Sequence, residues 1–551
     1  MKKTKKMLGF TLAAVMAIGG LAGCNREQAN NSVVSDGKTI NIRANNQGLG
    51  YAFVEEMCKK FNELYEDEGY KANLLAPIEG MSEQYIYQDI YQKSGVDIYV
   101  GAADLKGGVD GDYGLLFADL TESVYNQKPI RFDGTEEENT VLSKIEKFEY
   151  DNIYNDKYYG LPYVFSVSGL AVNTSLLKDF YGLELPRTTN EFAYCIEKIM
   201  EQASTTNVFP FTYSVGDNNY STAYVRTWMA QYGGIEEYTE FWSMEDYETG
   251  ETLSDPASVF GTESIEKMLE EFIRVYDYRT AAFGVESQNY KDAQKQLYRG
   301  EAVFYTVGDF LYNEEKVRNV SYLDDVSFIR IPILSSLGTK LFGTGTSYGF
   351  DEEKCEAVLS SIVECADANM AVTDIVNKVN TELSVSIAEA DVKTVCERRN
   401  YVYGNSETSN VFVSTHSEVK DICSLFLRMW ASDDGASLIA KNMNSNNPFN
   451  LRALENVDNS WQPNVTDIVT NRYMTQLPMN ATGFRREEAA ISGAFTLTGL
   501  RVHSYVLQNH RVTIYKEGSY KKEGDWSVYK TAAQKMAEDI YTDAKNYNTL
   551  K

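Results

Sequence analysis

The stretch from Tyr158 to Phe192 constrains the fold more than any other part of the chain. It reads YYGLPYVFSVSGLAVNTSLLKDFYGLELPRTTNEF, so a turn containing Gly-Leu-Pro-Tyr is followed by an apolar run over Val164–Val172. Thr188 and Glu191 have the spacing of a capping box, and apolar residues recur behind them at i, i+3, i+4 and i+7. The stretch therefore predicts a buried strand followed by an amphipathic helix over 188–203.

Upstream of this stretch, strand and helix patterns alternate. Strands are expected over 39–44, 71–76 and 96–100, and helices with apolar faces over 51–67 and 81–93. Strands separated by single helices pair in parallel, and the loops at their carboxyl ends form the ligand side of such a sheet. The N-terminal hundred residues therefore predict an α/β fold.

The order of motifs over residues 39–450 resembles that of the extracellular solute-binding proteins of ABC importers, of the maltose-binding-like carbohydrate type. In the family pattern YGLPY…YN…LF…G…P.TW.EF, Val172-Asn173 replaces Tyr-Asn and Thr189-Asn190 replaces Thr-Trp. Weaker matches lie on both sides of this stretch and keep the family's order. They are at Asp97-Ile98, Ala118–Thr121, Tyr224–Gly234, Tyr298–Phe304 and Val307–Phe310. The resemblance implies an α/β, two-lobe periplasmic-binding-protein-like fold with crossing hinge strands, plus an insertion and an extended C-terminal region.

The resemblance also implies where the lobes begin and end. The chain is expected to leave the first lobe near Pro162 and to return near Pro332. The family helix that should follow soon afterwards reappears only at 417–430, which indicates an insertion at about 351–409. The expected division is a signal over 1–23, a tether over 24–38, a first lobe over 39–163 and 334–450, and a second lobe over 164–333 and 451–551.

The first residues have the pattern of an export signal. Four early lysines precede an apolar segment from Met7 to Gly20, which is short for a membrane span. Leu21-Ala22-Gly23-Cys24 looks like a bacterial lipobox, which implies cleavage before Cys24 and a lipid on its sulfur. We therefore expect an exported protein that is lipid-anchored to the outer face of a bacterial cell membrane. An ordinary signal with a chance cysteine is the alternative.

Charge and cysteine usage exclude several classes of function. The formal charge of the chain is −27, and removal of the signal lysines makes it more negative still. Such a field repels phosphate backbones, so no nucleic-acid partner is expected. The six cysteines other than Cys24 are scattered and include no CxxC, which argues against zinc and redox motifs. No metal and no cofactor are predicted.

Candidate ligand residues follow from the expected cleft positions. Sugar rings present C–H faces that stack on aromatic side chains, and their hydroxyls need amide, carboxylate and backbone partners. The chain has 39 tyrosines and 5 tryptophans, which favours a carbohydrate ligand. The candidates on or near expected cleft elements are Asn46, Gln47, Asp104, Tyr163, Ser166, Trp228, Asp309, Phe310, Thr346 and Tyr348. Trp430 is expected to belong to the core instead.

The resemblance implies that the protein captures an oligosaccharide in the interlobe cleft and delivers it to the permease subunits of an ABC importer. Closure would be favoured by the ligand, because only the closed state contacts it from both sides. We expect a monomer with no catalytic residues.

Three alternatives remain at this point. An oligopeptide-binding lipoprotein would have a similar length and would need a cleft charge for the peptide termini. An exported serine hydrolase would use Ser347, because Gly345–Gly349 spells GxSxG, together with one of the three histidines, His416, His503 and His510. A surface adhesin would lack a cleft that can close.

Overall fold

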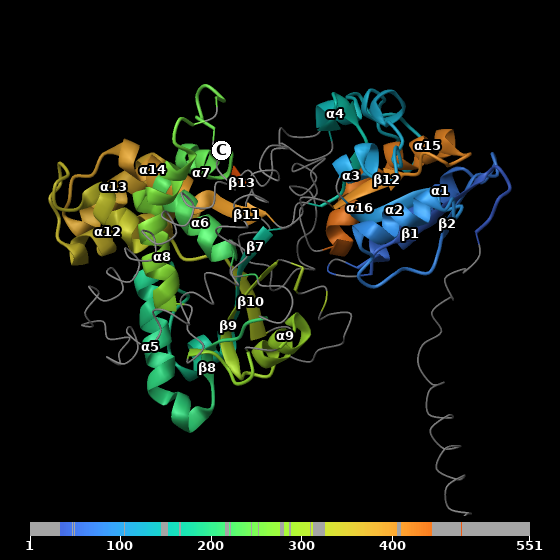
Figure 1. The fold of residues 1–551 in the computed structure, drawn as a ribbon. Coiled ribbons are helices and arrows are strands. Elements are labelled where there is room, and N and C mark those ends of the chain that lie inside the picture. Colours follow the sequence, from blue (N-terminus) through green and yellow to red (C-terminus); the bar gives the residue numbers. More distant parts are fainter. Residues whose placement is uncertain are drawn as a thin grey trace, which may run out of the picture.

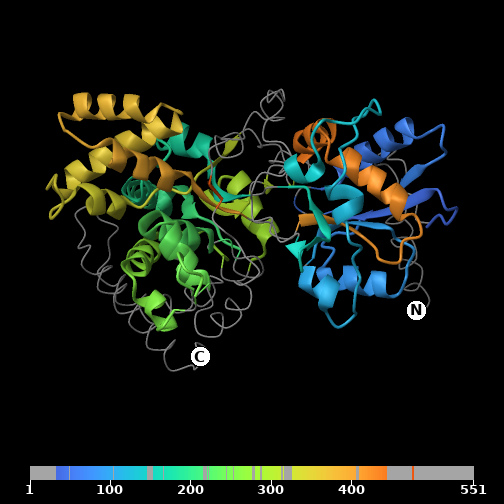
Figure 2. The same ribbon diagram turned by 90° about the horizontal axis from the view of Figure 1, so that it is seen from above.

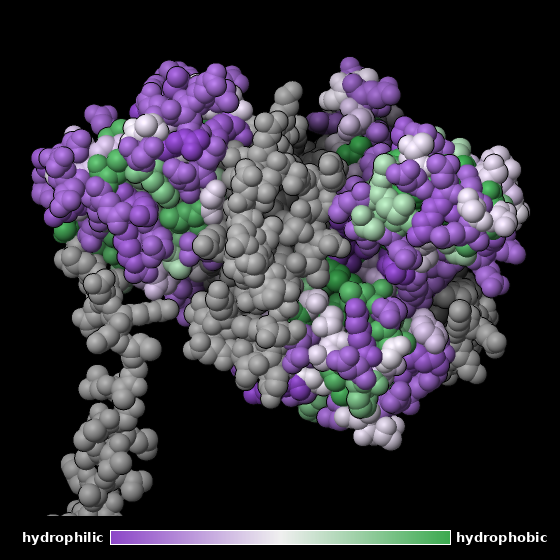
Figure 3. All heavy atoms as spheres, turned by 180° about the vertical axis from the view of Figure 1, so that it is seen from behind, coloured by the Kyte–Doolittle hydropathy of each residue, from purple (hydrophilic) through white to green (hydrophobic). Residues whose placement is uncertain are grey.

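The computed structural model describes residues 33–443 and 475–476, except for residues 47, 49, 104, 145–152, 165–166, 215–219, 221, 244, 252, 276–279, 286–287, 309, 312–313, 315–324 and 405–408. These residues form two α/β bodies, each built around its own sheet, and the two views in Figures 1 and 2 show them side by side. On the face that Figure 3 shows, the described surface of both bodies is mainly hydrophilic. We call the body that contains the N-terminal strands the first lobe and the other body the second lobe.

The first lobe contains a five-stranded sheet in the order β2-β1-β3-β12-β6. Strands β1, β2 and β3 pair in parallel, as their separation by single helices predicts, whereas β12 runs antiparallel to both β3 and β6. The bounds are β1 Thr39–Ala44, β2 Lys71–Leu74, β3 Ile98–Ala102, β6 Gly160–Pro162 and β12 Ser409–Val413.

Helices cover this sheet and bury one apolar face each. Phe53 and Phe61 of α1 pack with Phe426 and Trp430 of α15, and all four side chains are almost fully buried. The expectation that Trp430 is a core residue is therefore confirmed. The helices of the first lobe are α1 Ala52–Leu64, α2 Glu83–Tyr91, α3 Leu105–Asp110, α4 Val141–Lys144, α15 Lys420–Trp430 and α16 Asp433–Met443, with a π-helical turn over Thr121–Tyr125. A hairpin of β4 Ile153–Tyr154 and β5 Lys157–Tyr158 precedes β6.

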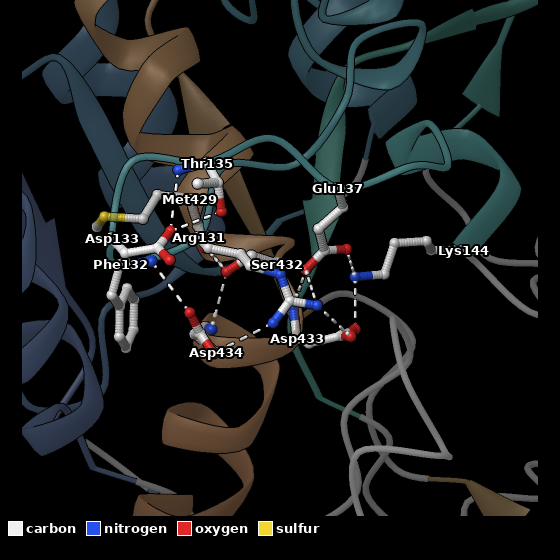
Figure 4. Close-up of polar contacts among 11 residues, drawn as sticks. Arg131, Phe132, Asp133, Thr135, Glu137, Lys144, Met429, Ser432, Asp433 and Asp434 are labelled. Atoms are coloured by element: carbon white, nitrogen blue, oxygen red, sulfur yellow. Dashed lines mark hydrogen bonds and ion pairs between the residues drawn. The ribbon is translucent and has the colours of Figure 1, made fainter.

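A group of ion pairs fixes the segment before α4 against the start of α16 (Figure 4). Arg131 lies 3.2 Å from Asp433, and Lys144 lies 2.8 Å from another oxygen of the same carboxylate. The carboxylate of Glu137 pairs with Lys144 and also accepts a hydrogen bond from the backbone N–H of Asp433 at 2.7 Å. Because anions are favoured at a helix N-terminus, these contacts stabilise α16 as well as the segment.

The second lobe contains a six-stranded sheet. Strand β7 pairs antiparallel with β9 along one edge, and with β10 and then β11 along the other edge. Strand β8 lies parallel to β9, and β13 lies parallel to β11. The bounds are β7 Val167–Asn173, β8 Phe209–Phe211, β9 Ala302–Gly308, β10 Val326–Ile329, β11 Tyr401–Gly404 and β13 Thr475–Gln476.

The helix predicted over 188–203 is α5, Thr189–Thr206. The Thr188 hydroxyl accepts a hydrogen bond from the Glu191 N–H at 3.2 Å, as the capping box predicts. The Glu191 carboxylate accepts from the backbone N–H of Arg187 at 2.7 Å. The other helices on this sheet are α6 Thr222–Gly233, α7 Ile235–Ser243, α8 Glu263–Val275 and α9 Tyr290–Tyr298, with a π-helical turn over Ser175–Phe180 and a 3₁₀ helix over Pro256–Gly261.

Four helices between β10 and β11 form a bundle with its own apolar core. They are α11 Ser335–Phe342, α12 Glu352–Asp367, α13 Val372–Leu383 and α14 Glu389–Asn400. The bundle packs on the second lobe, where the Glu356 carboxylate accepts hydrogen bonds from the Thr188 hydroxyl and the Asn190 amide. The expected division, which gave 334–350 and the insertion at about 351–409 to the first lobe, is therefore corrected.

The chain passes from β6 to β7 through residues 163–166, next to Pro162. The return expected near Pro332 is wrong, because the Ile333 N–H donates to the Arg187 carbonyl at 2.8 Å and holds this segment on the second lobe. The chain returns instead between β11 and β12. Strand β13 lies on the second sheet, while the other residues of 451–551, the predicted signal and most of the tether lie outside the described residues.

Candidate functional site

The loop after β1 is joined to the loop after β2. The Asn46 N–H donates to the Ile78 carbonyl at 2.8 Å, and the Asn45 side chain accepts from the Met81 N–H at 3.2 Å. Gly48 has φ +65°, a conformation that favours glycine. These loops follow the carboxyl ends of parallel strands, which is where ligands bind in open α/β sheets.

On the second lobe, an aromatic cluster surrounds the end of β9. Phe310 is half-buried, and its ring centroid lies 6.1 Å from that of Tyr220, which in turn lies 6.3 Å from that of Tyr305. Gly308 has to lack a side chain, because a Cβ there would come within 2.2 Å of the Phe310 ring. The glycine thus lets the ring of Phe310 fold back over the strand end.

These two segments meet between the lobes. The Gly48 N–H donates to Oε1 of Glu314 at 3.1 Å, and a Cβ built on Gly48 would lie 3.8 Å from the Phe310 ring. Helix α9, on the side of the second lobe nearer the first lobe (Figure 1), supports the contact, because Gln294 donates to Oε2 of Glu314 at 2.5 Å. Of the residues predicted from the sequence, Asn46 and Phe310 therefore lie on facing segments.

Two of the predicted aromatic ligand residues belong to the cores of the lobes. The Tyr163 ring stacks on Phe53 at 5.5 Å and is 7% exposed. Trp228 is fully buried, stacks on Tyr224 at 4.8 Å, and donates its indole N–H to the Pro332 carbonyl at 2.9 Å. Neither ring presents an open face to a sugar, so both assignments are corrected. Their apolar bulk contributes to packing instead.

Thr346 and Tyr348 lie in the turn between α11 and α12, within the helical bundle. The Thr346 hydroxyl donates to the Gly343 carbonyl at 2.8 Å. The Tyr348 hydroxyl donates to Asp391 at 2.5 Å and accepts from the Ala388 N–H at 2.9 Å. These contacts fasten the turn to α14, so the two residues serve the bundle, and their expected place in the cleft is corrected.

Four further predicted ligand residues, Gln47, Asp104, Ser166 and Asp309, lie outside the described residues, as does the predicted lipidation site Cys24. Gln47 and Asp309 are sequence neighbours of Gly48 and Phe310. The residues that sequence reasoning missed are Gln294 and Glu314. One signal was readable, because Gln294 shares the buried face of α9 with Ala293 and Leu297 and a buried polar side chain needs a partner.

The arrangement around Ser347 does not match a serine hydrolase. A nucleophile elbow joins a strand to a helix, whereas this turn follows helix α11. His416 lies on the first lobe in the turn after β12. Its backbone N–H donates to the Ser414 hydroxyl at 3.2 Å, and burial lowers the pKa of its imidazole. His503 and His510 lie outside the described residues.

Within the part of the chain that the structure describes, no group of three or more His, Cys, Asp or Glu side chains could hold a metal ion. No helix in that part is long and apolar enough to span a bilayer.

The sequence matches no protein-family model and no curated protein. Solved structures do match. A Thermus thermophilus maltotriose-binding protein bound with maltotriose aligns with 92% of this chain and 99% of its own, at a TM-score of 0.52 and 14% identity. A protein from a study of xylan utilization by Caldanaerobius polysaccharolyticus aligns with 85% of this chain and 99% of its own, at a TM-score of 0.53 and 13% identity. A solute-binding protein in complex with raffinose aligns with 92% of this chain and 99% of its own, at a TM-score of 0.51 and 13% identity.

This chain has the two-lobe periplasmic-binding-protein fold. The fold expected from the order of sequence motifs is confirmed, although the crossing points differ from those expected.

Proposed function

We propose that the protein is an extracellular solute-binding protein that captures an oligosaccharide between its lobes and delivers it to the permease subunits of an ABC importer. The observation that carries the proposal is the meeting of the loop after β1 with the end of β9, because it brings strand-end loops of two separate sheets to one place. The shared fold with structures named for maltotriose and raffinose supports a sugar ligand.

The mechanism follows from contacts on both sides of the ligand. A sugar held by both lobes binds the closed state more tightly than the open one, so it shifts the population toward closure. Phe310 offers an aromatic surface for the sugar C–H face, and Asn46 offers an amide for hydroxyls. Gln47, Asp104, Ser166 and Asp309 complete the proposed ligand set. The permease would then recognise the closed lobes, and no chemistry on the ligand is needed.

We also propose that the mature protein is a monomer anchored through lipid on Cys24. The basic and apolar segments before Leu21-Ala22-Gly23-Cys24 support this part of the proposal. Expression of the full chain in a bacterium with lipoprotein processing should give a membrane-bound product, and Cys24→Ala should release it into the soluble fraction. A soluble wild-type product would contradict the anchor and leave the ligand proposal intact.

A thermal-shift screen tests the ligand class. The mature chain should be heated with di- to tetrasaccharides of different linkage and, in parallel, with di- to tetrapeptides. A ligand at 100 times its dissociation constant stabilises the folded state by about 2.7 kcal/mol, which is readily seen as a higher melting temperature. Stabilisation by a glycan supports the proposal. Stabilisation by peptides alone would replace the oligosaccharide with a peptide ligand.

A further inference from the structure

Glu314 is a carboxylate shared between the two lobes. Its side chain belongs to the second lobe and the residue is only 8% exposed. One oxygen accepts a hydrogen bond from Gln294 of α9, a side chain that is fully buried in the same lobe. The other oxygen accepts from the backbone N–H of Gly48 in the first lobe. Separation of the lobes therefore breaks one of these bonds and leaves the other intact.

The donor on the first lobe is held in place. The Asn46 N–H, two residues before Gly48, donates to the Ile78 carbonyl at 2.8 Å and joins this part of the loop to the loop after β2. The positive φ of Gly48 disfavours any residue with a side chain. The amide of Gly48 thus meets Glu314 in this arrangement of the lobes.

A second contact lies on the same face of α9. Lys291, one turn before Gln294, lies 2.7 Å from Glu79 in the loop after β2. Both side chains are well exposed, at 42% and 65%, and exposed ion pairs contribute little because water screens them. The bond to the buried Glu314 carboxylate is therefore the stronger of the two contacts, since charge-assisted hydrogen bonds gain strength away from water.

We propose that Glu314 is a latch that raises the closed fraction of the ligand-free protein, so that less ligand binding energy is needed to complete closure. This inference rests on the proposed function, because closure is the event that the latch regulates. By favouring the closed arrangement, the latch raises the fraction of binding-competent protein and tightens the apparent affinity for a ligand that binds both lobes. Loss of the latch lowers the closed fraction of the ligand-free protein. The apparent affinity then falls by the same factor as that fraction.

The test measures the distance between the lobes without any ligand. Spin labels on noncanonical amino acids at position 60 of α1 and position 393 of α14 report the distance by pulsed electron resonance in the mature chain. Glu314→Ala should raise the ratio of open to closed molecules about tenfold, as expected for loss of one charge-assisted hydrogen bond. Glu314→Gln keeps an acceptor for the Gly48 N–H and should give a smaller increase.

Two controls separate the latch from a general weakening of the lobe. Glu201→Ala removes an exposed carboxylate from α5 of the same lobe and should leave the distance unchanged. Lys291→Ala should raise the open-to-closed ratio about threefold or less. Circular dichroism checks that each variant is folded. If Glu314→Ala does not fold, Glu314→Gln is the variant that tests the latch.

Each outcome decides the latch separately from the function. Identical distance distributions for wild type and a folded Glu314 variant would overturn the latch, even if a glycan binds. A wild-type protein with no closed fraction at all without ligand would also overturn it. A longer distance in Glu314→Ala, found in a protein that no glycan stabilises, would support the latch and contradict the proposed oligosaccharide ligand.

Discussion

The molecule contains two interfaces that differ in kind. The helical bundle is held on the second lobe by hydrogen-bonded charged groups, whereas the contacts between the lobes that involve described residues include the Gly48–Glu314 hydrogen bond and an exposed ion pair. Asp367 of α12 pairs with Arg399 of α14 inside the bundle and with Arg330 of the second lobe at 3.3 Å. Another Arg399 nitrogen donates to the Ile331 carbonyl of the second lobe at 2.9 Å. We therefore expect the first interface to resist separation and the second to open at lower cost. A receptor that closes around a solute needs this difference.

The largest expected effect is at the bundle. Arg399→Ala removes the bidentate partner of the half-buried Asp367 carboxylate, which keeps its contact with Arg330. We therefore expect a loss of about 3 kcal/mol in the free energy of unfolding, at the low end for a broken buried pair. Chemical denaturation measures this loss. Lys393→Ala on the same helix is the matched control, since this side chain is 62% exposed and should change stability by less than about 0.5 kcal/mol. Equal effects of the two variants would show that the bundle is not fixed in this way.

A smaller and different effect is expected where the lobes meet. Phe310→Ala should weaken glycan binding about tenfold, or about 1.4 kcal/mol, while the folded lobe remains intact. Titration calorimetry with the stabilising glycan measures the affinity. Phe180→Ala is the control, because this ring is 57% exposed in the turn beyond the far end of β7 and should not affect binding. An unchanged affinity for Phe310→Ala would remove this ring from the site.

The pH dependence of the bundle interface should contain two contributions of opposite sign. Burial raises the pKa of Glu356 above its ordinary value of 4.5, so the folded state retains the proton longer than the unfolded state does. Its contribution to stability is therefore lost as the pH rises above 4.5 through the folded pKa. Burial also acts to raise the pKa of Asp367, but the charges of Arg399 and Arg330 outweigh it and hold this pKa below 3.8. That contribution is lost as the pH falls below 3.8.

Denaturation at several pH values distinguishes the two groups. Glu356→Gln should become more stable relative to wild type as the pH rises above 4.5. The gain should reach about 1.4 kcal/mol for every pH unit that separates the folded pKa of Glu356 from its ordinary value. The deficit of Asp367→Asn should shrink below pH 3.8. Parallel pH profiles for wild type and both variants would contradict these assignments.

Local parts of the fold could be predicted from the sequence. Strands β1 to β3 and helices α1 and α2 follow one another along the chain. Their hydrophobic patterns were therefore sufficient to predict these elements and their parallel pairing. The cap at Thr188 was readable because its bonds span only three residues. The return crossing was not readable, because the bond between Ile333 and Arg187 joins residues far apart in sequence. Helices α12 to α14 show apolar faces, but either lobe could have covered those faces.

The site was predictable to a smaller extent. Asn46 was predicted from its place after a parallel strand, and Phe310 from the resemblance of Val307–Phe310 to a family ligand loop. The structure brings these two segments together, and their role in ligand binding stays a prediction. Trp228 was misassigned, since an aromatic residue in the helix over 224–234 has the same pattern whether it packs or binds, and its indole N–H donates to the backbone carbonyl of Pro332. Glu314 carries no motif. Its role depends on a contact between two lobes, which becomes visible only when both are folded.

The interlobe distance in Glu314→Ala during a glycan titration tests most directly whether the lobes close on a solute. With the latch removed, the account predicts a long distance without ligand and a return to the distance of glycan-saturated wild type as a stabilising oligosaccharide fills the site. A distance that stays long while the glycan binds would contradict capture between the lobes.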